Sequence, residues 1–153
     1  MSIIDIYTDG SLIKKKGNIY CGYGIYFPNK ECQMISRKFI HSPITNNRAE
    51  LYAIYKSIKI TETIHKKHKI MEINIYSDSE YAVKTFNIWY QKWIKNGKDY
   101  LNKDIIDNVI NLKNKLPYKI NFIHIRAHTG NTDQKSINNE IVDRLAKDGA
   151  LLS

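Results

Sequence analysis

The order of strand-like and helix-like segments is the feature that most limits how this chain folds. Three segments rich in β-branched and aromatic residues, 3–8, 20–27 and 32–40, come first. Amphipathic helical patterns then alternate with two further β-type segments, 70–76 and 119–125. A hairpin meander followed by helical crossovers requires a mixed sheet. We therefore expect an α/β fold, a five-stranded mixed sheet flanked by helices, in the order β-β-β-α-β-α-α-β-α.

Turn and capping residues predict where these segments begin and end. Asp9-Gly10-Ser11 predicts a turn that ends the first strand, and residues 14–18 form a polar loop. Thr45-Asn46-Asn47 offers caps for the first helix, and Asp78-Ser79 offers caps for the second. The last helix is expected to begin between residues 136 and 139.

Length and composition exclude several protein classes. A chain of 153 residues corresponds to about one domain of ordinary size. Its 42% hydrophobic and 25% charged residues exclude disordered and collagen-like chains, and two cysteines are too few for a disulfide scaffold. We find no apolar run near the roughly 20 residues that span a bilayer, and no signal peptide. We expect residues 1–153 to form a single cytoplasmic domain with reduced cysteines.

The net charge of +9 favours polyanionic partners such as nucleic acid, because basic residues release counterions on binding. A lysine-rich coding bias explains the same charge without any function. Charge alone therefore leaves the two explanations open.

Four acidic residues, Asp9, Glu50, Asp78 and Asp143, stand at or near predicted element boundaries. In α/β sheets, ligands bind outside the carboxyl ends of strands, where Asp9 and Asp78 would be neighbours if their strands are adjacent. Clustered carboxylates repel one another and persist mainly where cations neutralise them, and oxygen ligands suit Mg²⁺ or Mn²⁺. Each acid alone also has a structural explanation, as a turn, a helix cap or an ion pair with a neighbour such as Lys147.

Neighbouring residues make these acids more informative, because four segments resemble the signature segments of type 1 ribonuclease H. They are Tyr7-Thr8-Asp9-Gly10-Ser11, Thr45-Asn46-Asn47-Arg48-Ala49-Glu50-Leu51, Tyr76-Ser77-Asp78-Ser79-Glu80-Tyr81, and His128-Thr129-Gly130 with Asn139-Glu140 and Asp143-Arg144-Leu145-Ala146. The resemblance covers almost the whole chain in the family's order. It implies a ribonuclease H-like fold and a free-standing catalytic domain, which cuts the RNA strand of RNA/DNA hybrids and leaves 5′-phosphate and 3′-hydroxyl ends.

The resemblance also assigns the catalytic roles. It implies two Mg²⁺ ions with substrate bound, with Mn²⁺ as an alternative, held by Asp9, Glu50, Asp78 and Asp143. Asp9 would bridge both ions, Glu50 and Asp78 would hold the ion on the leaving-group side, and Asp143 the one nearer the attacking water. His128 matches the family's mobile catalytic histidine, although a histidine on a surface loop is its ordinary alternative. Fifteen residues separate His128 from Asp143, a longer gap than is usual in the family.

Candidate substrate-binding residues follow from the same resemblance. Asn46 and Asn47 match positions that contact the RNA strand, and their alternative role is helix capping. The remaining candidates are Thr45 and Asn102 for a phosphate of the DNA strand, Trp89, Trp93 and Lys95 for the DNA-strand channel, and also Asn18 and Asn139. A tryptophan pair at i, i+4 is by default a core pair, but the interleaved lysines favour a basic aromatic platform. The stretch between Gly97 and Asn102 is shorter than the family's basic protrusion.

Two other functions compete with this hypothesis. One is a catalytically silent nucleic-acid-binding module, and the other is a resolvase- or integrase-like nuclease of the same superfold. In each case the partner is nucleic acid, the RNA/DNA hybrid in our preferred hypothesis. We expect no membrane association, no obligatory protein partner and a monomer.

Overall fold

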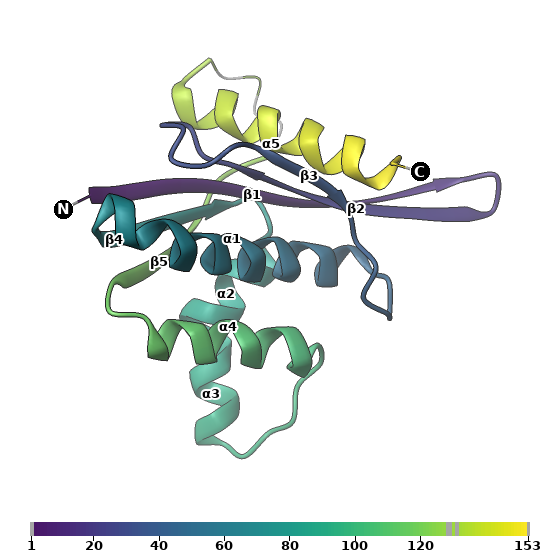
Figure 1. The fold of residues 1–153 in the computed structure, drawn as a ribbon. Helices are drawn as coiled ribbons and strands as arrows, with labels where there is room; N and C mark the ends of the chain where they lie inside the picture. The colour runs from purple at the N-terminus through teal and green to yellow at the C-terminus, as the bar shows by residue number, and fades with distance from the viewer. Residues whose placement is uncertain (1, 128–129, 131, 153) are drawn as a thin grey trace.

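The computed structural model describes residues 2–127, 130 and 132–152, and it contains one mixed five-stranded sheet (Figure 1). The strand order is β3-β2-β1-β4-β5. The β1–β2 and β2–β3 pairs are antiparallel, whereas β1–β4 and β4–β5 are parallel. This confirms the predicted mixed sheet. The strands are β1 (Ser2–Lys15), β2 (Asn18–Tyr26), β3 (Ile35–Lys38), β4 (Ile70–Ser77) and β5 (Lys119–His124).

Helices cover both faces of the sheet (Figure 1). One face carries α1, with α4 packed against it, and the opposite face carries α5 over β1, β2 and β3. The helical elements are α1 (Asn46–His68), α2 (Glu80–Lys84), the π-helix η1 (Thr85–Trp89), α3 (Tyr90–Lys95), α4 (Lys103–Lys115) and α5 (Gln134–Ala150). No helix in the described part of the chain is both long enough and apolar enough to cross a membrane.

The apolar stripe of α1 explains how this helix is held on the sheet. Leu51, Ile54 and Ile58 share one helical face and are fully buried. Burying each of them contributes about 2 kcal/mol. Thr45 caps the helix, because its Oγ1 accepts a hydrogen bond from the Arg48 amide at 3.1 Å. The α1 N-terminus, which carries Glu50, is therefore placed firmly against β1.

Glycines bring α5 directly onto the backbone of β2. A Cβ at Gly22 would lie 2.1 Å from the Ala150 amide nitrogen, and one at Gly24 would lie 2.8 Å from the Val142 carbonyl oxygen. A side chain at either position would push the helix away. The two glycines therefore set the depth at which α5, and Asp143 on it, lies above the sheet.

The first hairpin differs from the sequence-based expectation. β1 does not end at Asp9-Gly10 but continues to Lys15, with Asp9 opposite Gly24 in β2. The expected turn at Asp9 is wrong, and the expected loop at 14–18 is too long, because pairing with β2 satisfies the backbone up to Lys15 and again from Asn18. The actual turn is Lys16-Gly17, where both residues have positive φ.

Three other boundaries also differ. β3 is only four residues long, shorter than the predicted 32–40 segment. The α5 helix begins at Gln134, two residues before the expected range, after Asp133 as its N-cap. Between α2 and α3 the chain continues through η1 without interruption, whereas the sequence predicts one helix that ends at about Asn87 and another from Trp89 to Lys98. Phe86 in this segment stacks on Phe122 of β5, with ring centroids 4.8 Å apart, which holds the π-helical turn against the sheet.

Candidate active site

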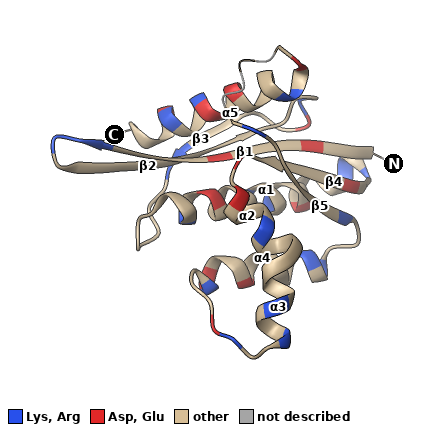
Figure 2. Cartoon of the chain, turned by 180° about the vertical axis from the view of Figure 1, so that it is seen from behind, with Lys and Arg blue, Asp and Glu red and all other residues tan. Residues whose placement is uncertain are grey.

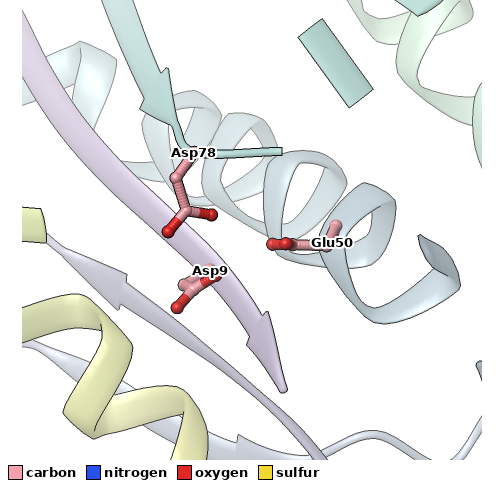
Figure 3. A group of neighbouring side chains, drawn as sticks. All are labelled: Asp9, Glu50 and Asp78. Atoms are coloured by element: carbon pink, nitrogen blue, oxygen red, sulfur yellow. The ribbon is translucent and has the colours of Figure 1, made fainter. Parts of the chain in front are cut away.

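Three carboxylates from separate elements converge at one end of the central strands (Figure 3). Asp9 lies within β1, Asp78 directly follows β4, and Glu50 lies in the early turns of α1. Each offers an oxygen atom, and these oxygens all lie within 4.8 Å of one another. Parallel pairing of β1 and β4 makes Asp9 and Asp78 neighbours, as the sequence predicted if the strands were adjacent.

Gly10 lets the helix and the strand come this close. A Cβ at Gly10 would lie 2.5 Å from the Glu50 amide nitrogen, so any other residue would force α1 away from β1. The Gly10 amide donates hydrogen bonds to Glu50 Oε1 at 2.6 Å and to Asp9 Oδ1 at 3.0 Å. One backbone group therefore orients two of the three carboxylates.

The electrostatics of the group are unfavourable for the protein alone. Asp9 is 3% exposed and Glu50 is 5% exposed. Burial, followed by repulsion from neighbouring carboxylates, raises the pKa of both groups above the usual carboxylate range. No lysine or arginine in the described ranges forms an ion pair with Asp9, Glu50 or Asp78. A set of buried oxygen ligands that lacks a protein cation fits a divalent metal ion.

Asp143 approaches this group from α5 but is not part of it. Its charge contributes to the raised pKa values of Asp9 and Glu50, so it is close enough to interact with them. Its own carboxylate forms an ion pair with Lys147 at 3.0 Å, one helical turn further along. The structure thus brings three of the four predicted acids together and places the fourth beside them.

Asn139 links α5 to the carboxylate group. Its side chain is 2% exposed, and its Nδ2 donates to Asp78 Oδ2 at 3.3 Å. Its Oδ1 is buried and has no hydrogen-bond partner among the described residues, which leaves an acceptor for a bound group. His128 lies outside the described residues.

A second group of predicted residues lies at the α1 N-terminus and the start of α4. Asn46 and Asn47 are exposed, and Thr45, one of the three predicted capping residues, is the helix cap, so Asn47 does not take its alternative capping role. Asn102 Nδ2 donates to the Tyr81 hydroxyl at 2.9 Å. The buried Arg48 donates to the Asn102 side-chain oxygen at 3.4 Å, and so connects this residue to α1.

Arg48 is a residue that the sequence analysis quoted without giving it a role. Its guanidinium forms two hydrogen bonds with the Asp104 carboxylate, at 2.8 and 2.9 Å. The pKa of Asp104 is lowered by these bonds. Arg48 is only 3% exposed, and a charged residue is buried in this way only when it is paired. The residues around it in the sequence, Asn46, Asn47 and Glu50, are themselves polar and gave no signal of this burial.

The tryptophan pair lies beside a hollow of about 270 Å³ whose lining includes Asn47, Tyr81, Trp93 and Asn102. Trp93 is half-buried and stacks on Tyr100, with centroids 5.0 Å apart and planes 9° apart. Trp89 and Trp93 are 6.2 Å apart, and Lys95 is exposed at the end of α3. One face of the Trp93 ring is therefore covered by Tyr100, a contact that only the fold brings about.

Asn18 lies apart from the other candidates. It pairs with Lys15 beside the β1–β2 turn, six residues beyond Asp9 along β1. At about 3.3 Å per residue, this position is about 20 Å from the carboxylate group.

The chain is similar in sequence to known ribonucleases H. The RNase H family model matches residues 2–151. A ribonuclease H from Campylobacter jejuni is 34% identical over 152 residues, which cover 99% of this chain and 93% of that protein. A ribonuclease H from Orientia tsutsugamushi is 31% identical over 97% of this chain and 82% of its own length. A probable ribonuclease H of Acanthamoeba polyphaga mimivirus is 35% identical over 84% of this chain, which spans only 58% of that protein.

Solved structures show the same fold. The solution structure of the RNase H domain of prototype foamy virus matches with a TM-score of 0.73 and 22% identity, over 96% of this chain and 93% of that domain. A structure of the foamy viral protease-reverse transcriptase in complex with an RNA/DNA hybrid matches with a TM-score of 0.73 and 20% identity, over 97% of this chain and 20% of that one. With the family model matching nearly its whole length, this chain belongs to the ribonuclease H family.

Proposed function

We propose that this protein cuts the RNA strand of RNA/DNA hybrids by metal-dependent hydrolysis. The observation that carries the proposal is the convergence of Asp9, Glu50 and Asp78 within 4.8 Å. The family supports the reaction class, and the foamy viral structure of the same fold that holds an RNA/DNA hybrid supports the substrate class. The three carboxylates come from one chain, so the reaction needs no second subunit, and we propose that the protein acts as a monomer. We also propose that it is a single domain and that it acts in the cytoplasm.

The carboxylates would hold Mg²⁺, or Mn²⁺ in its place. Asp9, Glu50 and Asp78 offer hard oxygen ligands within 4.8 Å of one another, and we propose that Asp143, whose charge acts on Asp9, adds a ligand for a second ion. When bound, divalent cations supply polarisation of the phosphodiester and of the attacking water, together with neutralisation of the developing charge. Two features support this assignment. The pKa values of Asp9 and Glu50 are raised, and no lysine or arginine in the described residues forms an ion pair with these carboxylates.

The chain's own groups position the reaction. Water attacks phosphorus in line and the P–O3′ bond breaks, so the products carry a 5′-phosphate and a 3′-hydroxyl. The Gly10 amide holds the Glu50 and Asp9 carboxylates in place, and Asn139 holds Asp78. We assign proton transfer or assistance to product release to His128, because a side chain that titrates near neutral pH suits both tasks.

Substrate recognition would rest on backbone contacts. Amide side chains both donate to and accept from a 2′-hydroxyl, which suits Asn46, Asn47 and the free Oδ1 of Asn139 for the RNA strand. The DNA strand would lie along Thr45, Asn102, Trp89, Trp93 and Lys95, with Trp93 presenting only the ring face that Tyr100 leaves open.

A cleavage assay tests the proposal. Labelled RNA/DNA, RNA/RNA and DNA/DNA duplexes are incubated with Mg²⁺, with Mn²⁺ or with a chelator, and product ends are analysed on a gel. We expect cleavage of the RNA strand of the hybrid alone, only with metal, and none by the Asp9→Asn variant. Binding without cleavage would instead indicate a silent module, and cleavage of duplex DNA a resolvase-like nuclease.

A further inference from the structure

Two tyrosines lie just before the two aspartates of the candidate site. Tyr7 precedes Asp9 by two residues on β1, and Tyr76, near the end of β4, precedes Asp78 by two residues. Tyr7 and Tyr76 are partners in the parallel β1–β4 pairing, and their rings stack with centroids 4.7 Å apart and planes 13° apart. Alternate residues of a strand share one face, so the Tyr7 ring lies on the same face of the sheet as Asp9. We call the stacked pair the tyrosine seat.

The start of α5 has no apolar anchor of its own. The helix carries charged residues of both signs along its length (Figure 2). Of its first six residues, only Asn138 and Asn139 are buried, and both are polar. The first buried apolar residue is Val142, which belongs to the same buried cluster as Tyr7 and Tyr76. Apolar packing therefore holds α5 from Val142 onward, and polar contacts must hold the turns before it.

Two contacts hold these first turns on the tyrosine seat. The Lys135 ammonium lies over the Tyr76 ring, 5.5 Å from its centroid, which is within the range of a cation–π contact. Asn138 is 3% exposed, and its Oδ1 accepts a hydrogen bond from Gln134 Nε2 at 2.8 Å. The Asn138 side chain also forms a hydrogen bond with the Tyr7 hydroxyl. One buried hydrogen bond and one cation–π contact therefore join the start of α5 to the seat.

The residue after Asn138 reaches the carboxylate group. Asn139 donates to Asp78 Oδ2 at 3.3 Å, which is longer than most N–H···O hydrogen bonds, so this bond alone holds the helix only weakly. Adjacent residues of a helix move together, because backbone hydrogen bonds tie each turn to the next. The contact that fixes Asn138 on Tyr7 therefore also fixes Asn139 beside Asp78.

We propose that Tyr7, Tyr76 and Asn138 are positioning residues of the candidate site, which fix the first turns of α5 so that Asn139 stays in contact with Asp78. The inference deepens the proposed function, because it concerns how the same carboxylate group is held. These residues act through Asn139 and not on the substrate. Their role is separate from that of the β2 glycines, which set the depth of the later turns of α5.

The test uses substitutions that remove one polar group at a time. Tyr7→Phe removes the hydroxyl and keeps the stacked ring, and Asn138→Leu replaces the amide by an apolar group of the same branched shape. The double variant, Tyr7→Phe with Asn138→Leu, makes both partners apolar and so leaves no unpaired group between them. The matched control is Tyr26→Phe, because Tyr26 packs in the same cluster and lies opposite Tyr7 on β2 but takes no part in the contacts above.

The first measurements use metal-free protein without substrate, so they do not depend on catalysis. Hydrogen exchange of the α5 backbone amides reports how often each turn opens. Exchange at residues 138–143 should be about fivefold faster in each single variant, the usual effect of losing one hydrogen bond, and unchanged after Ala146. The double variant should lose no more protection than either single variant, because both changes remove the same bond. The NMR signals of the Asn139 side-chain amide should shift in these variants and stay in place in Tyr26→Phe.

Turnover then tests whether the seat positions the site. A small displacement of a group beside the reaction lowers its rate strongly, so kcat on an RNA/DNA hybrid should fall by about tenfold in Tyr7→Phe and in Asn138→Leu. Hybrid affinity should fall by less than about threefold, because most of the proposed substrate contacts lie on other elements. Tyr26→Phe should keep the kcat of the parent.

Three results would overturn the inference. They are equally faster exchange along the whole of α5, the same changes in Tyr26→Phe, and an unchanged kcat in both single variants. The first two would show a general loss of stability, and the third would show that the seat does not position the site. A parent that cuts no hybrid would refute the nuclease, whereas the exchange rates and the Asn139 signals of the metal-free protein would still support or overturn the seat.

Discussion

Gly24→Ala tests whether the depth of α5 on the sheet controls the candidate site. Gly24 lies opposite Asp9 in the β1–β2 pair. A Cβ there would lie 2.7 Å from the Leu145 Cβ and 2.8 Å from the Val142 carbonyl oxygen, next to Asp143. Ordinary contacts begin at 3.4 Å, so α5 must move away by about 0.6 Å. The movement displaces Asp143 and Asn139 relative to the carboxylates on the sheet.

The magnitude follows from two separate effects. Overpacking against a helix backbone costs about 1–3 kcal/mol, which for a chain of this size lowers the melting temperature by about 2–4 °C per kcal/mol. A displacement approaching 1 Å in a catalytic group lowers turnover by up to about 10²-fold. We therefore expect kcat on a short hybrid to fall by about tenfold or more, with little change in KM.

Gly17→Ala is the matched control. Gly17 has a φ of 79° and no atom within 4 Å of an added Cβ, so alanine strains the backbone without moving a helix. It should lower thermal stability by a similar amount and leave kcat on a short hybrid unchanged. Turnover of Gly24→Ala within twofold of the parent, measured where both are folded, would refute the argument that α5 positions the site. An equal loss in Gly17→Ala would show that stability alone explains the effect.

Four further predictions concern the candidate site and the Trp93 segment. Asp9→Asn should abolish cleavage and raise the free energy of unfolding of the metal-free protein by about 1–2 kcal/mol, because it removes a buried, repelled carboxyl group. The raised pKa values of Asp9 and Glu50 mean that the folded state binds more protons than the unfolded state, so the stability of the metal-free protein should fall as pH rises above the ordinary carboxylate pKa. Urea unfolding of the parent and of Asp9→Asn from pH 5 to 8 checks both predictions. A steeper fall of stability with pH in the variant than in the parent would contradict them. His128→Ala should lower kcat by about 10²-fold with hybrid affinity nearly unchanged, and a strong binding defect with normal kcat would exclude the assigned role. Trp93→Ala with Lys95→Ala should weaken hybrid binding and reduce its salt slope by about 0.9 for the lost charge, and an unchanged slope by titration would return this segment to a structural role.

Local patterns were enough to predict most of the elements. The apolar stripe of α1, the β-type run of β4 and the proline that follows α4 act within a few residues, so they identify helices and strands from sequence. Asp78 was correctly predicted to follow β4, because a strand and its end are local features. The structure brings together Asp9, Glu50 and Asp78, three of the four acids whose motifs predicted a shared site.

Only the tertiary structure decided the features that depend on distant partners. β1 continues through Asp9-Gly10 because β2 provides hydrogen-bond partners there. The Asp-Gly pair predicts a turn from local sequence alone, which contains no information about this pairing. Likewise, Trp93 is covered by Tyr100, which lies beyond the loop that follows α3. Residue types and short spacings thus determined which chemistry the chain carries. Strand pairing and side-chain packing determined where each group lies, because the free energies of pairing and packing depend on residues far apart in sequence.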